Sequence, residues 1–163
     1  MDSLFTFAES FPAALQWFAV MLIGAIPFVE SYGGAALGVL TGIPPAVAIL
    51  AAVIGNVVAM ALTVWIAGSI RDRAVEKRRR NGTEQPEPGK RKQRLQRMFE
   101  RFGVPGVSLL GQSLLPSHVT APTLVGFGAS RTSVLVWQTI GIAAWGVAFG
   151  LLAAAGVSVA LRC

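Results

Sequence analysis

Four long stretches of this chain carry no charged residue, and this absence constrains its fold more than any other feature. They are residues 10–29, 31–70, 103–130 and 132–161. Only 13% of the 163 residues are charged, whereas about 25% is typical of soluble domains. Crossing roughly 30 Å of hydrocarbon takes about 20 apolar residues in a helix. We therefore expect an all-α integral membrane protein.

Two uninterrupted segments are typical of membrane-spanning helices. Residues 44–69 begin with two prolines, which suit the first turn of a helix. Residues 131–161 form a second, longer apolar segment that begins at Arg131. At about 1.5 Å per residue, each segment is long enough to cross a bilayer with some tilt. We predict a transmembrane helix over each of them.

The two other apolar blocks, residues 11–42 and 103–129, are interrupted by helix breakers. The breakers are Pro27, Gly33 and Gly34 in the first block and Pro116 and Pro122 in the second. A continuous lipid-facing helix tolerates such residues poorly, because each freed backbone group needs a partner. We predict that each block is a re-entrant helical hairpin. Four ordinary spanning helices are the alternative.

The order of hairpin and helix occurs twice, in residues 1–70 and again in residues 103–163. Residues 71–102 link the two halves and contain twelve of the fourteen Lys and Arg residues. The positive-inside rule places this linker in the cytoplasm, so both termini are expected outside. The halves then form an inverted repeat, an arrangement that places a binding site near the middle of the membrane.

The linker itself has two parts. Residues 78–90 contain no large apolar side chain and predict a flexible segment. Residues 92–102 have apolar side chains at helical spacing among basic ones, which predicts an amphipathic helix on the cytoplasmic surface. Because membrane orientation explains the basic charge, we do not expect a nucleic-acid partner.

Glu30 is the only acidic residue inside any apolar block. Carboxylates within a membrane are rare, costly and functional by default. Low-dielectric surroundings favour the neutral form of a carboxyl group, which suits the binding and release of a proton. A cationic substrate could compete for the same group. The alternative is that Glu30 caps the second hairpin arm by accepting backbone N–H groups near Gly33.

Further polar residues accompany the breaks. The candidates for substrate or proton binding, besides Glu30, are Ser31, Tyr32, Asn56, Gln112, Ser117, His118 and Thr120. Asn56 is a candidate to hydrogen-bond to the first hairpin tip, and the hydroxyl groups could line a polar path or satisfy broken backbone. A lone histidine such as His118 is more often structural than functional. Gly34, Gly38 and Gly42 recur every fourth residue, which favours close helix packing.

Enzymatic chemistry has little support in this sequence. It contains no paired-carboxylate motif, no GxxxxGK[ST] phosphate-binding loop and no nucleophile–base pair at a recognisable spacing. The chain has one histidine and one cysteine, Cys163, too few for a Cys/His metal site. We expect no enzymatic activity, no metal and no cofactor.

Residues 26–39, IPFVESYGGAALGV, and the later VIGN of residues 53–56 resemble the bacterial small multidrug export family. That family has a Pro-x-x-Glu-x-Arg-Gly opening and a Gly-Asn in the following helix. Residues 114–122, LLPSHVTAP, look like its second hairpin. Two departures are Tyr32, where the family usually has Arg, and Ala36, where it often has Pro. The first removes the Arg that would pair with Glu30.

The resemblance extends to the DedA (VTT-domain) superfamily, whose members share two re-entrant hairpins in an inverted repeat. It implies a multi-pass protein of the bacterial inner membrane and either of two activities. One is proton-coupled export of hydrophobic cations, and the other is flipping of lipids such as polyprenyl phosphates. The hairpin tips carry no arginine for a phosphate, which favours the first. A non-transporting scaffold is a third possibility, and the thin bundle of helices favours a homodimer.

Overall fold

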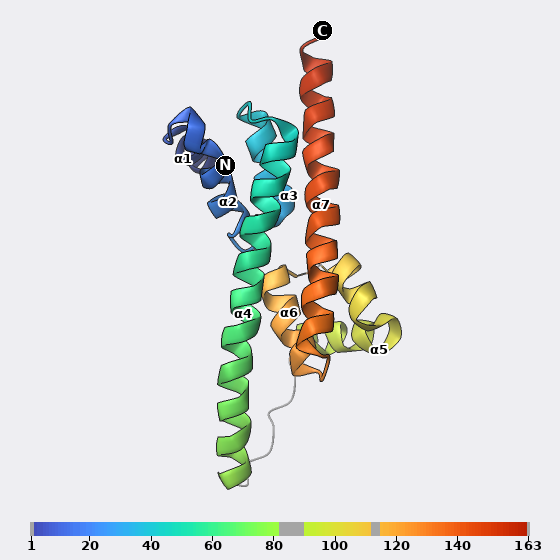
Figure 1. Cartoon of the computed structure of the whole chain (residues 1–163). Coiled ribbons are helices and arrows are strands. Elements are labelled where there is room, and N and C mark those ends of the chain that lie inside the picture. The colour runs from blue at the N-terminus through green and yellow to red at the C-terminus, as the bar shows by residue number, and fades with distance from the viewer. Residues whose placement is uncertain (1, 82–89, 112–114, 163) are drawn as a thin grey trace. The chain divides into compact units, whose positions relative to one another are not determined.

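The computed structural model describes residues 2–81, 90–111 and 115–162 (Figure 1). Its elements are α1 (Asp2–Glu9), the 3-10 helix η1 (Ala13–Leu15), α2 (Gln16–Gly24), α3 (Glu30–Leu40), α4 (Pro45–Asn81), α5 (Lys90–Leu110), α6 (Ser117–Gly126) and α7 (Arg131–Ala160). None of the described residues forms a strand. The expectation of an all-α protein is therefore confirmed.

The chain divides into two compact units. The first contains Met1–Ala59 and Thr139–Cys163, and the second contains Met60–Gln138. Each of the long helices α4 and α7 is divided between the two units, α4 after Ala59 and α7 after Gln138.

Among the described residues, two helices are long and apolar enough to cross a membrane, which indicates a membrane protein. They are Pro45–Ile66 within α4 and Arg131–Ala160, the whole of α7. Helix α4 continues past residue 69, where we expected the spanning helix to end, as far as Asn81. Residues 69–81 contain neither glycine nor proline, so nothing in the local sequence interrupts the helix.

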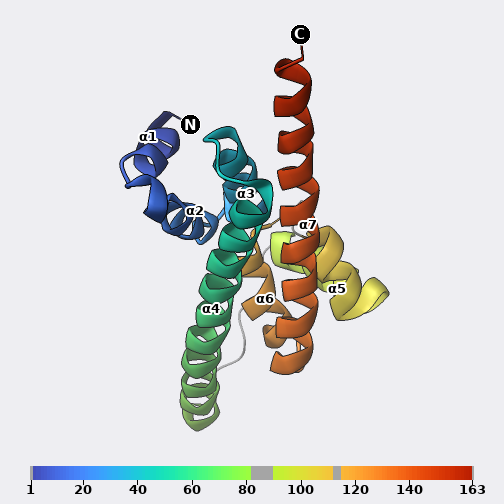
Figure 2. The ribbon, with the colours of Figure 1, turned by 45° about the horizontal axis from the view of Figure 1, so that its top comes forward.

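In the first unit, α2 and α3 form an antiparallel helical hairpin (Figures 1 and 2). A Cβ atom placed on Gly34 would lie 3.1 Å from the Gly24 Cα, and one placed on Gly38 would lie 3.0 Å from Val20 Cγ2. The two helices have 9 and 11 residues, or about 14 and 17 Å at 1.5 Å per residue. Each arm is thus shorter than the roughly 30 Å of a hydrocarbon core.

The same two glycines bring α3 against α4. A Cβ atom on Gly34 would lie 3.1 Å from the Ala52 Cβ, and one on Gly38 would lie 2.8 Å from the Ala48 Cβ. These pairs show that α3 and the first turns of α4 are antiparallel. The expected role of both glycines in close helix packing is confirmed.

The break in the first hairpin lies earlier than we expected. It spans residues 25–29 and includes Pro27, whereas Gly33 and Gly34 are inside α3. Gly34 is needed for close packing, and helix interiors accept glycine at a cost of only about 1 kcal/mol. Gly42, by contrast, has a φ of +90°, and no atom lies within 4 Å of a Cβ added to it. It ends the hairpin rather than packing it.

In the second unit, α5 is broken at Gly103, whose φ of 65° and ψ of −168° are not helical. Helix α5 packs on α6, and a Cβ atom on Gly111, the residue after α5, would lie 3.6 Å from Thr120 Cγ2. Pro116 is the N-cap of α6, while Pro122, which we expected to break the helix, lies inside it. Proline at that position removes one backbone donor without ending the helix.

Candidate functional site: polar groups at the helix breaks

The described residues include a small set of polar side chains that are buried among apolar ones. In the first unit these are Glu30, Ser31 and Asn56, and in the second they are Ser108, Ser117, His118, Thr120 and Gln138. Among the residues whose side chains are described, Glu30 is the only buried carboxylate. Burying a carboxylate costs several kcal/mol unless it is compensated (about 3 for an acidic residue at the centre of a membrane helix).

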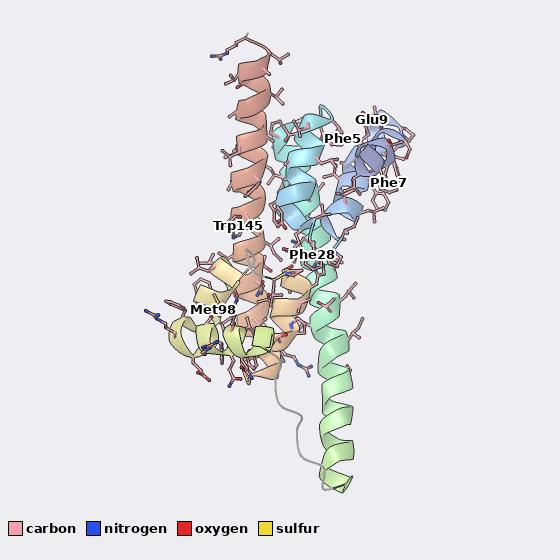
Figure 3. The ribbon with its side chains drawn as sticks, turned by 180° about the vertical axis from the view of Figure 1, so that it is seen from behind. Phe5, Phe7, Glu9, Phe28, Met98 and Trp145 are labelled. Carbon is pink, nitrogen blue, oxygen red and sulfur yellow. The ribbon has the colours of Figure 1, made fainter. Side chains whose placement is uncertain are left out.

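The backbone around Glu30 adopts an unusual conformation. Glu30 has a φ of 52°, and Phe28, labelled in Figure 3 at the connection between α2 and α3, has a φ of 72°. Left-handed backbone at non-glycine residues costs on the order of 1–3 kcal/mol each and concentrates at functional sites. The carboxylate therefore sits on a strained turn at the start of α3, fully buried.

Asn56 lies on α4 at the level of Glu30. The antiparallel register of α3 and α4, continued by one turn beyond Gly34 and Ala52, places Glu30 opposite Asn56. Both side chains have an exposed fraction of 0%. By this register two of the predicted site residues, on separate helices, are at the same level of the first unit.

Ser31 connects the break to α7. Its hydroxyl group donates a hydrogen bond of 2.7 Å to the Ile142 carbonyl. Gly146, one turn further along α7, is close enough that an added Cβ would lie 3.2 Å from the Ser31 Cβ. Ser31 is therefore a link between α3 and α7 in the first unit, rather than a hydroxyl group that lines an open path.

Tyr32 and Gly33 lie beside these residues but make local contacts. The Tyr32 hydroxyl group donates to the Phe28 carbonyl at 2.8 Å, and its ring lies 5.5 Å from that of Phe149. The Gly33 N–H, which we considered as a donor to Glu30, donates instead to the Val29 carbonyl at 2.9 Å. The Gly33 N–H thus takes part in the backbone hydrogen bonding at the start of α3.

In the second unit, the predicted residues gather at the start of α6. The Ser117 hydroxyl lies 3.5 Å from His118 Nδ1, and the Thr120 hydroxyl donates to the Leu115 carbonyl at 3.3 Å. The Thr120 hydroxyl group therefore provides a hydrogen-bond donor for a backbone carbonyl group in the broken segment. Gln112, the remaining predicted residue, lies outside the described residues.

Sequence reasoning missed Gln138 and Ser108. Both side chains have an exposed fraction of 0%, and within the described part of the chain neither the Gln138 amide nor the Ser108 hydroxyl has a hydrogen-bond partner. Gln138 is the one amide side chain between Arg131 and Leu161. A single amide in a long apolar segment could have identified Gln138 from the sequence, because polar side chains within spanning helices are costly.

The described residues contain no group of three or more His, Cys, Asp or Glu side chains that could hold a metal ion. What the geometry offers is a single buried carboxylate on a strained helix break, with an amide at its level. Such a group can exchange a proton or bind a cation. The chain matches no family model, no curated protein and no solved structure at a significant level.

Proposed function

We propose that this chain is a small membrane transporter that couples proton binding at Glu30 to the export of hydrophobic cations. The observation that carries the proposal is the position of Glu30, fully buried and in left-handed backbone at the break between α2 and α3. We further propose that the protein lies in the bacterial inner membrane, forms a homodimer and belongs to the small multidrug export family.

The chemistry of a single carboxylate supports this activity. A buried carboxylate is compensated by either a proton or a cation, and both cannot occupy it at once. Competition of this kind couples the release of one to the binding of the other. The strained backbone at Glu30 and Phe28 lowers stability. This cost supports a functional role for the turn that holds the carboxylate.

Local features that recur in both halves support two re-entrant hairpins arranged as an inverted repeat. Gly42 and Gly128 both have positive φ, and each is followed by a residue whose N–H bonds five residues back, Ile43 to Gly38 and Ala129 to Leu124. Both hairpins end in this way and lead into a long helix.

Burial repeats in the same register. When Gly42 is matched to Gly128, the matched pairs Ser31 and Ser117, Ala35 and Ala121, and Val39 and Val125 are all buried. The short arms of each hairpin support a segment that enters and leaves on one side of the membrane.

Proton flux from proteoliposomes tests the proposed activity. The purified protein is reconstituted with an internal pH indicator, and hydrophobic cations of graded size are added outside. We expect proton movement with protein and none in protein-free liposomes. If well-folded protein shows no flux with any cation but moves a fluorescent lipid between leaflets, export of cations is wrong and the protein is a lipid translocator.

The proposed topology makes a separate prediction. With Cys163 replaced by serine, single cysteines are introduced by Ser3→Cys or by Gly89→Cys. We expect a membrane-impermeant maleimide added to intact cells to label the first variant and not the second, because the N-terminus lies outside and the basic linker inside. Labelling of both positions from one side would contradict the inverted repeat.

A further inference from the structure

The first part of α5, residues 90–102, presents an arginine stripe made of Arg94, Arg97 and Arg101. At about 100° per residue these three positions fall within a sector of about 60° on one flank of the helix. All three side chains are exposed. This stripe has no role in the transport proposed above.

The apolar face of the same segment is adjacent to the stripe. Phe99 packs on Phe127, the residue that follows α6, with a ring-centroid distance of 6.0 Å. Met98, labelled in Figure 3, is half-buried. Phe102 remains 46% exposed. Because Phe99 packs on Phe127, the rotation of this helix about its own axis is fixed, and so is the direction of the stripe.

The last arginine of the stripe is tied to the exposed apolar side chain. The Arg101 guanidinium lies 5.1 Å from the centre of the Phe102 ring. An arginine next to an exposed aromatic ring, at the end of an amphipathic helix, is the pattern of a helix lying in the headgroup region of a bilayer. Immediately after Gly103 the chain enters the apolar segment 104–111.

The acidic residue of this segment lies beyond the stripe, on the side away from the apolar face. Glu100 accepts a hydrogen bond of 3.1 Å there from Gln96, so the flank that carries the three arginines keeps an excess of positive charge. Guanidinium groups pair with phosphate oxygens in a bidentate manner, and weak hydration favours them at interfaces. Three exposed guanidinium groups on one flank match a row of negatively charged headgroups.

We propose that the arginine stripe binds the phosphate groups of anionic phospholipids, with Phe102 inserted at the level of the upper acyl chains. The occupant is a lipid surface rather than a nucleic acid, because a nucleic acid would use the charges but not the exposed Phe102. The proposal does not depend on what the protein transports.

Fluorescence of a label at position 102 tests this contact in the full-length chain. The variant carries C163S and F102C, is labelled with bimane, and is reconstituted in phosphatidylcholine with or without phosphatidylglycerol. Lipids that carry a spin label near the top of the acyl chain serve as quencher. We expect stronger quenching in the vesicles that contain phosphatidylglycerol. Equal quenching in the two kinds of vesicle would overturn the proposal.

A second variant set separates the stripe from the general charge of the linker. R94Q/R97Q/R101Q is compared with R71Q/R73Q/K77Q, which removes the same number of charges elsewhere in the linker. We expect only the first to reduce quenching to the level seen in phosphatidylcholine alone. Equal reduction by both would show that no specific stripe exists and would overturn the proposal.

A readout without a label uses thermal unfolding of the detergent-purified protein with short-chain phosphatidylglycerol. A ligand that binds the folded state raises the midpoint temperature, and tighter binding raises it further. At about fivefold per arginine near a lipid surface, R94Q/R97Q/R101Q should weaken the apparent affinity by about two orders of magnitude. Stabilisation of the wild type by single-stranded RNA, with none by phosphatidylglycerol, would overturn the proposal in favour of nucleic acid.

Discussion

Glu30→Gln is expected to reduce proton flux to the level of protein-free liposomes while the protein stays folded. Glutamine has nearly the same shape as glutamate, so the packing at the α2–α3 break is retained. An amide, however, carries no ionisable proton and no charge for a cation. Among the described side chains Glu30 is the only buried carboxylate, so no other described carboxylate can replace it at this position. The flux assay with hydrophobic cations described above measures the effect.

Glu9→Gln is the matched control. Glu9 is exposed at the end of α1, where Figure 3 labels it, and lies in the same unit as Glu30. We expect full flux in this variant and the same thermal midpoint as the wild type. Full flux in Glu30→Gln would exclude the carboxylate as the coupling group. Unfolding of Glu30→Gln would be visible separately as a lower midpoint.

The sequence predicted the parts of the fold that depend on the bilayer alone. Long runs without charge identify the two spanning helices, because the cost of a charge in hydrocarbon exceeds any local preference. The same argument found Glu30, the one acidic residue in an apolar run. Both inferences need only the identity of the residues and their spacing.

Features that depend on contacts between helices were less accessible. We expected Gly33 and Gly34 at the break, but they lie inside α3. The local sequence does not distinguish a glycine that breaks a helix from a glycine that packs against a neighbouring helix. Gln138 was missed because its burial depends on what surrounds it. The alignment of Glu30 with Asn56 depends on the α3–α4 register, which Gly34 and Gly38 fix through contacts one and two turns away.

Gly55→Ala is expected to lower the stability of the protein more than any other single-methyl change in the first unit. A Cβ atom on Gly55 of α4 would overlap the backbone carbonyl oxygen of Met21 in α2. A backbone atom cannot rotate away as a side chain can, so α2 has to move. Overpacking of a tight contact costs typically about 1–3 kcal/mol, and we expect a loss at the upper end of this range.

The same contact has a consequence for the candidate site. Helices in a membrane associate largely through close packing of small residues, since lipid tails are as apolar as the side chains. Gly24 makes a second such contact, because its added Cβ would lie 2.5 Å from the Ala52 carbonyl oxygen. These contacts hold α2 against α4 and therefore hold the break that carries Glu30. We expect Gly55→Ala to lose proton flux as well as stability.

Gly156→Ala provides the comparison. It introduces the same methyl group into α7, where no atom lies within 4 Å of the added Cβ. Alanine is the better helix former by about 1 kcal/mol, so this variant should be as stable as the wild type or slightly more so. Thermal unfolding of both variants in the same detergent measures the difference. Equal midpoints would mean that α2 does not approach α4 at Gly55 in the folded protein, and that this contact does not hold the break that carries Glu30.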